Sequence, residues 1–309
     1  MATRVFIDGS AGTTGLRIRE RLSARSDISL LVLPDQQRKD PTARLFALAQ
    51  CDVAFLCLPD AAATEVADMA NRQRLKTVII DTSTAHRTAD GWTYGFPELV
   101  GQRERIAAST RIANPGCHAT GFIACVAPLV AAGLIAPDAH LSAFSLTGYS
   151  GGGKAMIAQY ETDASERDSL LDAPRLYSLG QTHKHLPEMA KMCGLEQPPI
   201  FAPIVSDYFA GMLVGVPLAG ISPEIANEAL TSYYANARLV RVRPDADEAG
   251  FLSAGALAGR DSLEVAAFGN EERTLVCARF DNLGKGASGA AIQNMNIVLG
   301  KDESLGLVE

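Results

Sequence analysis

The stretch Arg4-Val5-Phe6-Ile7-Asp8-Gly9-Ser10-Ala11-Gly12-Thr13-Thr14-Gly15 opens the chain with an apolar segment and a glycine-rich turn, and an amphipathic segment follows it. A strand, a glycine-rich turn and a helix in this order are the context in which such a turn binds a dinucleotide. The glycines let the backbone approach a pyrophosphate, which the N-terminus of the helix then holds. A turn of this kind without a ligand is the alternative, and the spacing G-x-x-G-x-x-G differs from the commoner G-x-G-x-x-G. We expect cofactor contacts from the turn residues Gly9, Ser10, Ala11, Gly12, Thr13, Thr14 and Gly15.

Apolar strands and helices alternate through the next hundred residues. Strands are expected at 28–33, 52–58 and 77–81, with a helix at 61–72. Continuous apolar strands between helices indicate a parallel sheet that is covered on both faces, and ligands of such sheets lie beyond the carboxyl ends of the strands. Pro59, Ser83 and Arg87 follow two of these strands. The first two are candidate cofactor contacts, and Arg87 is a candidate anion contact or a surface arginine.

The second strand leads into Pro34-Asp35-Gln36-Gln37-Arg38-Lys39. An acidic residue at this place suits the ribose hydroxyl of NAD, whereas basic residues suit the 2′-phosphate of NADP. Asp35 matches the first pattern, and Arg38 with Lys39 matches the second. A solvated loop would carry the same charges. We favour NADP(H) as the cofactor.

The segment Asn114-Pro115-Gly116-Cys117-His118-Ala119-Thr120 precedes a long apolar stretch at 121–134. Asn114 is a suitable N-cap, and Pro115 would then take the first helical position. This interpretation places Cys117 in the first turn of a helix, where the free N–H groups and the helix dipole favour a thiolate nucleophile. The alternative is a buried cysteine that acts as a small hydrophobe.

The second half of the chain contains two further motifs. An alternating segment at 140–147 predicts a half-exposed antiparallel strand, and Gly148-Tyr149-Ser150-Gly151-Gly152-Gly153-Lys154 follows it. Consecutive glycines favour a nest of backbone N–H groups, to which Lys154 adds charge. In Gln181-Thr182-His183-Lys184-His185-Leu186-Pro187-Glu188, the two histidines share one face if the segment is extended, and Pro187 suits the start of a helix. The histidines and Glu188 indicate acid–base chemistry, since no further ligands at a recognisable spacing would complete a zinc site.

The remainder predicts a strand-rich second domain. Strands are expected at 203–218, 239–243, 263–268 and 274–281, with helices at 223–236 and 290–299. The last helix is rich in small residues, and we expect it to return to the first domain.

Composition limits the class of protein. The chain has 309 residues, of which 47% are hydrophobic and 20% charged, which is typical of a globular protein of two domains. A formal charge of −7 argues against nucleic acid or an anionic membrane as partner. The six cysteines form no C-x-x-C pair, so we expect reduced thiols, no structural metal and a cytoplasmic protein. We expect neither a signal peptide nor a membrane-spanning helix.

Five segments together resemble one enzyme family. They are Phe6-Ile7-Asp8-Gly9 with its glycine turn, Asn114-Pro115-Gly116-Cys117, Gly151-Gly152-Gly153-Lys154, His183-Lys184-His185-Leu186-Pro187-Glu188 and Asp281-Asn282-Leu283-Gly284-Lys285-Gly286-Ala287. Over nearly its whole length the chain resembles the N-acetyl-γ-glutamyl-phosphate reductases, in their shorter form. Aspartate-semialdehyde and glyceraldehyde-phosphate dehydrogenases are broader relatives.

The resemblance implies a fold and an assembly. The expected fold is α/β: a Rossmann-type doubly wound NADP-binding domain, and an α+β catalytic and dimerisation domain with a mixed, largely antiparallel sheet. We expect the first domain at 1–116 with 286–309 and the second at 117–285. The open face of the second sheet would form a subunit interface in a homodimer or homotetramer.

The resemblance also implies a reaction in arginine biosynthesis. N-acetyl-L-glutamyl 5-phosphate and NADPH would give N-acetyl-L-glutamate 5-semialdehyde, inorganic phosphate and NADP. Cys117 would attack the acyl phosphate, His183 or His185 would act as acid–base, and Glu188 would orient the histidine. The implied substrate contacts are Arg87, Asn114, Ser150 and Lys154, and Gln293 and Asn294 would lie near the nicotinamide, with Gly151 and Gly152 as further cofactor contacts.

One residue departs from the family pattern, and two other functions stay open. His118 stands where many relatives have tyrosine. An aspartate-semialdehyde dehydrogenase would carry out the same reaction on a shorter acyl phosphate. A nucleotide-sensing protein without catalysis would need neither Cys117 nor His183 with Glu188.

Overall fold

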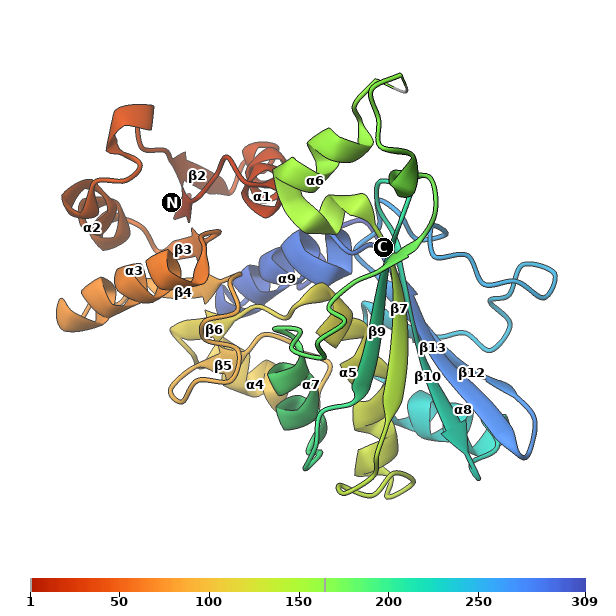
Figure 1. The fold of residues 1–309 in the computed structure, drawn as a ribbon. Coiled ribbons are helices and arrows are strands. Elements are labelled where there is room, and N and C mark those ends of the chain that lie inside the picture. The colour runs from red at the N-terminus through yellow and green to blue at the C-terminus, as the bar shows by residue number, and fades with distance from the viewer. Residues whose placement is uncertain (1, 164) are drawn as a thin grey trace. The chain divides into compact units, whose positions relative to one another are not determined.

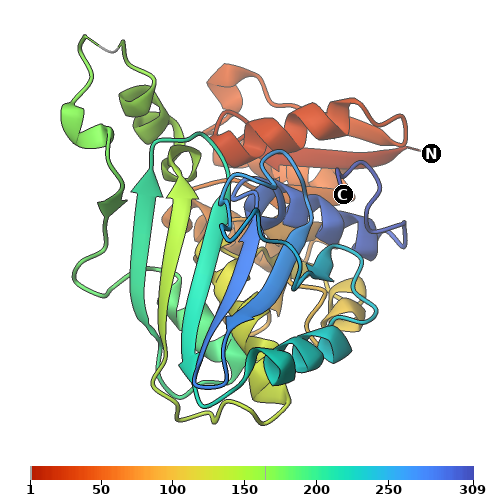
Figure 2. The ribbon, with the colours of Figure 1, turned by 90° about the vertical axis from the view of Figure 1, so that its right-hand side faces the viewer.

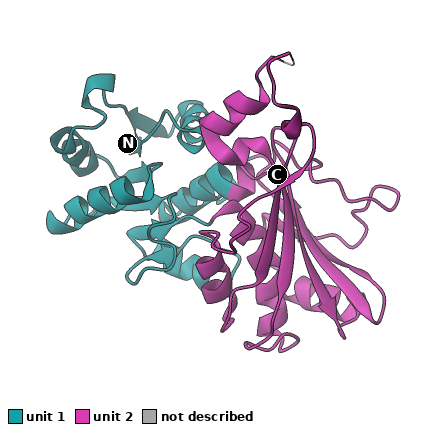
Figure 3. Cartoon of the chain, viewed as in Figure 1, with its two compact units in different colours: residues 1–115, 287–307 teal, residues 116–286, 308–309 magenta. Residues whose placement is uncertain are grey.

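The chain divides into two compact units. The computed structural model describes residues 2–163 and 165–309. Unit 1 comprises residues 1–115 with 287–307, and unit 2 comprises residues 116–286 with 308–309 (Figure 3).

Unit 1 contains a parallel sheet with the strand order β2-β1-β3-β4-β6-β5 (Figure 1). Its strands are β1 (Thr3–Asp8), β2 (Ile28–Leu31), β3 (Val53–Leu56), β4 (Val78–Asp81), β5 (Thr93–Tyr94) and β6 (Arg111–Ala113). β1 pairs with β2 on one side and with β3 on the other, both in parallel. The strand order therefore reverses beside β1, which is where ligands of open α/β sheets bind.

Helices cover both faces of this sheet. They are α1 (Thr13–Ser23), α2 (Pro41–Gln50), α3 (Asp60–Arg72), α4 (Gln102–Ala107) and α9 (Gly289–Val298). One buried cluster joins Ile18 of α1, Ile106 of α4 and Ile292 of α9 to the sheet. A second cluster joins Leu48 of α2 and Val66 of α3 to the sheet from residues such as Phe6 and Ala54. Because alternate strand residues enter different clusters, the unit is doubly wound.

Unit 2 contains a mixed sheet with the order β11-β12-β13-β10-β7-β9-β8. Its strands are β7 (Ser142–Gly148), β8 (Arg175–Leu176), β9 (Ile200–Ser206), β10 (Met212–Ala219), β11 (Val240–Val242), β12 (Leu263–Gly269) and β13 (Arg273–Phe280). β7 pairs antiparallel with β10 and parallel with β9. The prediction that β7 is an antiparallel strand is therefore correct for its pairing with β10 and wrong for its pairing with β9. The prediction of one long strand at 203–218 is wrong. The segment is two strands separated by a turn, in which Gly211 has a φ of +126°.

Helices lie on one face of this sheet. They are α5 (Cys117–Ala131), α7 (Leu186–Cys193) and α8 (Pro223–Tyr233), and α6 (Gly153–Tyr160) follows β7. α5 packs on β10 and β13, and α7 and α8 pack on α5. Figure 2 looks onto the opposite face of the strands. The predicted fold class, a doubly wound parallel sheet followed by a mixed, largely antiparallel one, is confirmed.

Candidate active site

The start of α5 differs from the expectation. The helix begins at Cys117, and Gly116 precedes it with an extended backbone (φ −80°, ψ 148°). The assignments of Asn114 as N-cap and Pro115 as first helical residue are therefore wrong. The N–H of Gly116 donates to Glu188 Oε2 at 3.2 Å. A carboxylate that is distant in sequence therefore accepts the hydrogen bond of the backbone N–H that precedes the helix. Cys117 is partly exposed at the first helical position, where the free N–H groups and the helix dipole favour a thiolate.

His183 and His185 meet through a turn. His185 has a helical backbone, so the premise of an extended segment is wrong. The N–H of His185 donates to Nδ1 of His183 at 3.1 Å, and the two ring centroids lie 4.6 Å apart, edge to face. Because Nδ1 of His183 accepts this bond, the proton of the neutral ring sits on Nε2. His183 is partly exposed, whereas His185 is 5% exposed.

Glu188 lies in the first turn of α7, with Pro187 beside the start of the helix, as the sequence predicts. Its side chain is 1% exposed. The bond to Gly116 therefore joins α7 to the residue before Cys117.

His118 connects the Cys117 turn to the histidine pair. Its ring centroid lies 5.3 Å from that of His183 and 5.6 Å from that of His185. Its two ring nitrogens contact Ser145 and Tyr177. Sequence reasoning missed Ser145 and Tyr177, because no motif or spacing joins them to Cys117. Their position follows from the pairing of β7, β8 and β9.

Gly286 packs directly against Cys117. A Cβ atom on Gly286 would lie 2.9 Å from the Cβ of Cys117 and 3.2 Å from the ring of Phe280. Gly286 thus forms part of the wall beside the cysteine, and a side chain at position 286 would collide with Cys117.

The glycine segment after β7 forms a short turn before α6. The N–H groups of Tyr149 and Ser150 donate to the carbonyls of Tyr208 and Phe209. Ser150 Oγ accepts a hydrogen bond from Asn282 at 3.0 Å, which anchors its buried side chain. Further along, Gly151, Gly152 and Lys154 are exposed.

The glycines of the first turn in unit 1 have different constraints. Gly9 has a φ of +84°, and a Cβ there would lie 2.1 Å from the carbonyl oxygen of Cys57. A Cβ on Gly15 would lie 2.5 Å from the carbonyl oxygen of Gly9, whereas one on Gly12 would meet its nearest atom at 3.5 Å. Gly12 precedes α1 without a side-chain cap. The N–H groups at the start of α1 and the bare backbone of Gly12 fit a pyrophosphate.

The other predicted cofactor contacts lie at several places in unit 1. Arg38 forms an ion pair with Asp35 at 2.7 Å, and Lys39 is exposed. Pro59 is exposed at the start of α3. Ser83 is buried, and its N–H and hydroxyl both donate to the carboxylate of Asp81, at 2.9 and 2.7 Å.

Arg87, Asn114 and Asn294 have backbone partners within unit 1. Nε of Arg87 donates to the carbonyl of Asn114 at 2.9 Å. The amide of Asn114 donates to the carbonyl of Ala287, and that of Asn294 donates to the carbonyl of Gly95. Gln293, also buried, donates to Glu98 at 2.9 Å.

The described part of the chain, residues 2–163 and 165–309, contains neither a metal-ligand cluster nor a membrane-spanning helix. Among these residues, no group of three or more His, Cys, Asp or Glu side chains could hold a metal ion. No helix there is both long and apolar enough to span a membrane.

Comparison with known proteins identifies the family. Residues 4–109 match the family model described as semialdehyde dehydrogenase, NAD binding domain, and residues 117–282 match semialdehyde dehydrogenase, dimerisation domain. An N-acetyl-gamma-glutamyl-phosphate reductase 2 of Nostoc sp. is 45% identical over 98% of this chain and 99% of its own. An N-acetyl-gamma-glutamyl-phosphate reductase of Brucella anthropi is 46% identical over 97% of this chain and 100% of its own. The chain belongs to the N-acetyl-gamma-glutamyl-phosphate reductase family. The family predicted from the sequence motifs is confirmed.

Solved structures of more distant relatives share the fold. Aspartate semialdehyde dehydrogenase II from Vibrio cholerae has a TM-score of 0.73 at 18% identity, covering 97% of this chain and 99% of its own. Aspartate semialdehyde dehydrogenase with NADP from Candida albicans has a TM-score of 0.64 at 15% identity, covering 98% of this chain and 100% of its own.

Proposed function

We propose that this chain reduces N-acetyl-L-glutamyl 5-phosphate to N-acetyl-L-glutamate 5-semialdehyde with NADPH, releasing phosphate, in arginine biosynthesis. The observation that carries the proposal is the placement of Cys117 as the first residue of α5, with its helix turn packed on the histidine pair through His118. Relatives that carry this enzyme name at about 45% identity over the whole chain support the substrate. They disfavour aspartate semialdehyde as the product.

Cys117 acts as the nucleophile. Its thiolate attacks the acyl carbon, the bond from that carbon to the phosphate oxygen breaks, and a thioester remains on the sulfur. The N–H groups at the start of α5 stabilise the oxyanion of the tetrahedral intermediate. When bound, NADPH supplies the hydride that reduces this thioester.

His183 is the acid–base in this proposal. Its Nε2 carries the proton of the neutral ring, and the side chain is partly exposed, whereas His185 is buried. His183 protonates the alkoxide of the reduced intermediate and recovers the proton as the carbon–sulfur bond breaks. Glu188 holds the start of α5 through Gly116 and lies one turn after His185.

The remaining candidate contacts divide between the units. In unit 1, residues 9–15 hold the pyrophosphate, Arg38 and Lys39 meet the 2′-phosphate, and Pro59, Ser83 and Asn294 complete the cofactor contacts. Arg87 and Asn114 contact the substrate. In unit 2, Gly151 and Gly152 contact the cofactor, and Ser150 and Lys154 contact the substrate. On this assignment unit 1 is the NADP-binding domain and unit 2 the catalytic and oligomerisation domain.

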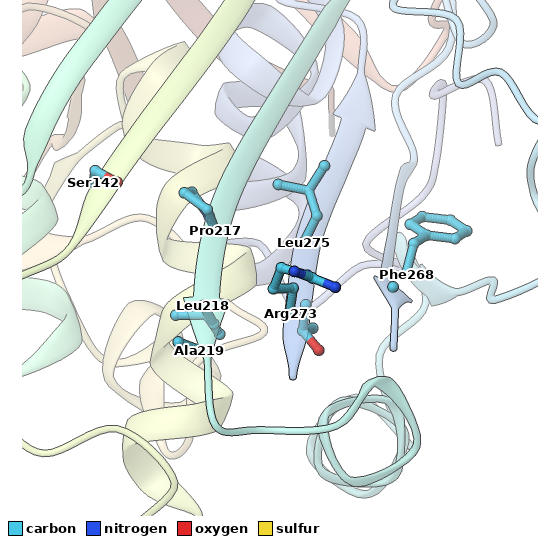
Figure 4. A pocket seen from close by; sticks show the side chains of 9 residues that line it. Ser142, Pro217, Leu218, Ala219, Phe268, Arg273 and Leu275 are labelled. Carbon is cyan, nitrogen blue, oxygen red and sulfur yellow. The ribbon is translucent and has the colours of Figure 1, made fainter. Parts of the chain in front are cut away.

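The open face of the second sheet forms the subunit interface of a homodimer or homotetramer. A hollow of about 660 Å³ lies on neighbouring strands of this sheet. Figure 4 shows Pro217, Leu275 and Phe268 among the residues that line it. The family model covering the sheet is described as a dimerisation domain. An apolar sheet face of this kind is stabilised by burial against a second copy. The six free cysteines support a cytoplasmic location.

The test is the reverse reaction. NADP reduction is followed with N-acetylglutamate semialdehyde and phosphate for the wild type, Cys117→Ser and Cys57→Ser, whose thiol is also partly exposed. We expect phosphate-dependent activity in the wild type and in Cys57→Ser, and a loss of about 1,000-fold or more in Cys117→Ser. Equal activity in Cys117→Ser would remove Cys117 from the mechanism. Activity with aspartate semialdehyde alone would replace the substrate.

A further inference from the structure

The side-chain amide of Asn282 joins segments of unit 2 that are far apart in sequence. Its Oδ1 accepts a hydrogen bond from the N–H of Gly211 at 2.9 Å, and its Nδ2 donates to Ser150 Oγ at 3.0 Å. Asn282 follows β13, Gly211 directly precedes β10, and Ser150 follows β7. Asn282 and Ser150 are each 1% exposed. Both hydrogen bonds are therefore shielded from water.

The bond to Gly211 determines the direction of the bond to Ser150. A backbone N–H only donates, so the Asn282 atom that faces it is the carbonyl oxygen. The atom that faces Ser150 is then the amide nitrogen, which donates and has no lone pair to accept with. Ser150 Oγ must accept this bond, which leaves its own proton for another partner. Within residues 2–163 and 165–309, the Ser150 hydroxyl donates to no acceptor.

A single turn connects Asn282 to the cysteine. The N–H groups of Gly284 and Gly286 both donate to the carbonyl of Asp281, at 3.1 and 3.0 Å, so residues 281–286 form a closed turn. At one end of this turn Asn282 holds Ser150. At the other end Gly286 packs on Cys117, since a Cβ there would lie 2.9 Å from the Cβ of Cys117. The turn therefore contacts both the serine and the nucleophile.

The segment that carries Ser150 suits an anion. Residues Tyr149–Gly152 form a short turn that leads into α6, and Lys154 is exposed in the first turn of that helix. A hydroxyl donor and a lysine ammonium on one short segment together recognise a negatively charged oxygen. The substrates of the proposed reaction carry such oxygens on the phosphate and on the carboxylate of the N-acetylglutamyl group.

We propose that Asn282 is a positioning residue: by donating to Ser150 Oγ, it directs the Ser150 hydroxyl proton to an anionic oxygen of the bound substrate. Asn282 itself does not touch the substrate and acts through Ser150 alone. The proposal rests on the proposed function above, in which Ser150 contacts the substrate. It adds the residue that makes this serine a donor.

The test exchanges the donor on Asn282 for an acceptor. Asn282→Asp keeps an oxygen for the Gly211 N–H but places a second oxygen opposite Ser150, which then takes the hydroxyl proton. Asn227→Asp is the matched control, because the Asn227 amide bridges only the N–H and the carbonyl of Ala267, at 2.8 and 2.9 Å. The kcat and the KM values for phosphate, N-acetylglutamate semialdehyde and NADP are measured in the reverse reaction. Circular dichroism establishes that each variant is folded.

We expect Asn282→Asp and Ser150→Ala each to raise the KM for one of the two anionic substrates by about 10-fold. The KM for NADP and the kcat should stay within about 3-fold of the wild type. An increase for phosphate identifies the acceptor as a phosphate oxygen, and an increase for the semialdehyde identifies it as the carboxylate. Asn227→Asp should keep the wild-type KM values. Unchanged KM values for both anionic substrates in Asn282→Asp would overturn the proposal, as would an increase for NADP alone.

The double variant separates the hydroxyl from the added charge. Asn282→Asp with Ser150→Ala should also raise the KM by about 10-fold, because both substitutions act through one hydroxyl. Repulsion by the new carboxylate alone would persist without the serine, so an increase of about 100-fold would overturn the proposal.

An uncharged variant covers a failure of Asn282→Asp to fold. Asn282→Ala removes the amide without adding a charge, and it should raise the KM by about 3-fold in the wild type and not at all in Ser150→Ala. Equal effects in the two backgrounds would contradict the coupling. A wild type without phosphate-dependent activity would refute the proposed function. An active wild type with unaltered Asn282 variants would refute the role of Asn282 alone.

Discussion

The Oε2 atom of Glu188 accepts a hydrogen bond from the backbone N–H of Gly116, with 3.2 Å between the two atoms. Gly116 directly precedes Cys117, and Glu188 lies in the first turn of α7. One buried carboxylate therefore joins the starts of two helices. It sets the position of the nucleophile as well as the position of the segment that carries the histidines.

Substitutions of Glu188 should separate these two contributions. Glu188→Gln keeps an oxygen acceptor for the Gly116 N–H but removes the negative charge beside the histidine segment. We expect unchanged stability within about 1 kcal/mol and a kcat lower by about 10- to 100-fold. Glu188→Ala leaves the Gly116 N–H without this acceptor. We expect it to lower the free energy of unfolding by a further amount of about 1–3 kcal/mol. Urea denaturation measures the change in stability, and steady-state kinetics measure the change in kcat. Equal stability of Glu188→Gln and Glu188→Ala would contradict the role of Glu188 as acceptor for the Gly116 N–H.

Gly286→Ala should damage the site through Cys117. The new Cβ would lie 2.9 Å from the Cβ of Cys117. The position of the Cys117 Cβ is fixed by the helix backbone, so a change of rotamer cannot relieve the contact. We expect a kcat lower by about 10-fold or more and a loss of about 1–3 kcal/mol in stability. Gly255→Ala in the same unit is the control, since its new Cβ would meet its nearest atom at 3.8 Å. If the two variants have the same activity, Gly286 is not a wall of the cysteine site.

The glycines of the first turn should respond differently to alanine. Gly12→Ala meets no atom closer than 3.5 Å, so the folded state should tolerate it. The methyl group would occupy the space where a pyrophosphate approaches the backbone, and we expect NADPH to bind about 10-fold more weakly or worse. Gly15→Ala would place a methyl group 2.5 Å from the carbonyl oxygen of Gly9 and should lower the melting temperature. Calorimetric titration with NADPH and thermal denaturation distinguish the two, and undiminished binding by Gly12→Ala would refute the cofactor role.

Asp8 should make unit 1 sensitive to pH. Burial raises its pKa from 3.8 to about 6, against the opposing effect of Arg44, whose Nε lies 3.1 Å from the carboxylate. A raised pKa means that the folded state binds the proton more tightly than the unfolded state. The stabilisation from Asp8 is therefore complete below pH 3.8 and is lost as the pH rises to about 6. Relative to Asp8→Asn, the wild type should lose stability between these values in urea denaturation, and parallel curves would contradict this.

Leu275→Arg should disrupt the assembly. Leu275 lies on β13 at the hollow in the open face of the second sheet, and a charge there would have to be buried in an interface. We expect a smaller particle by light scattering after size-exclusion chromatography. Phe251→Arg is the control, because Phe251 is 77% exposed outside these strands. An unchanged mass for Leu275→Arg, with a reduced mass for Phe251→Arg, would place the interface elsewhere.

Local patterns in the sequence determined the elements that carry the chemistry. The strand, glycine turn and helix of residues 3–23 follow from apolar periodicity and glycine spacing. The position of Cys117 in a first helical turn and that of Glu188 in another follow from the adjacent prolines and apolar segments. These features depend on neighbours within a few residues, so short-range sequence rules reach them.

Long-range packing decided the rest. Asn114 makes a good N-cap by local rules, yet its amide bonds to Ala287, and Gly116 takes the capping position with Glu188 as its partner. Ser145 and Tyr177 carry no motif, and the motif that contains Gly286 does not say what Gly286 contacts. Sheet pairing and close packing bring these residues beside the Cys117–His118 turn. A hydrogen bond or a Cβ contact between residues tens of positions apart depends on the tertiary fold, because spacing along the chain does not set distance in space.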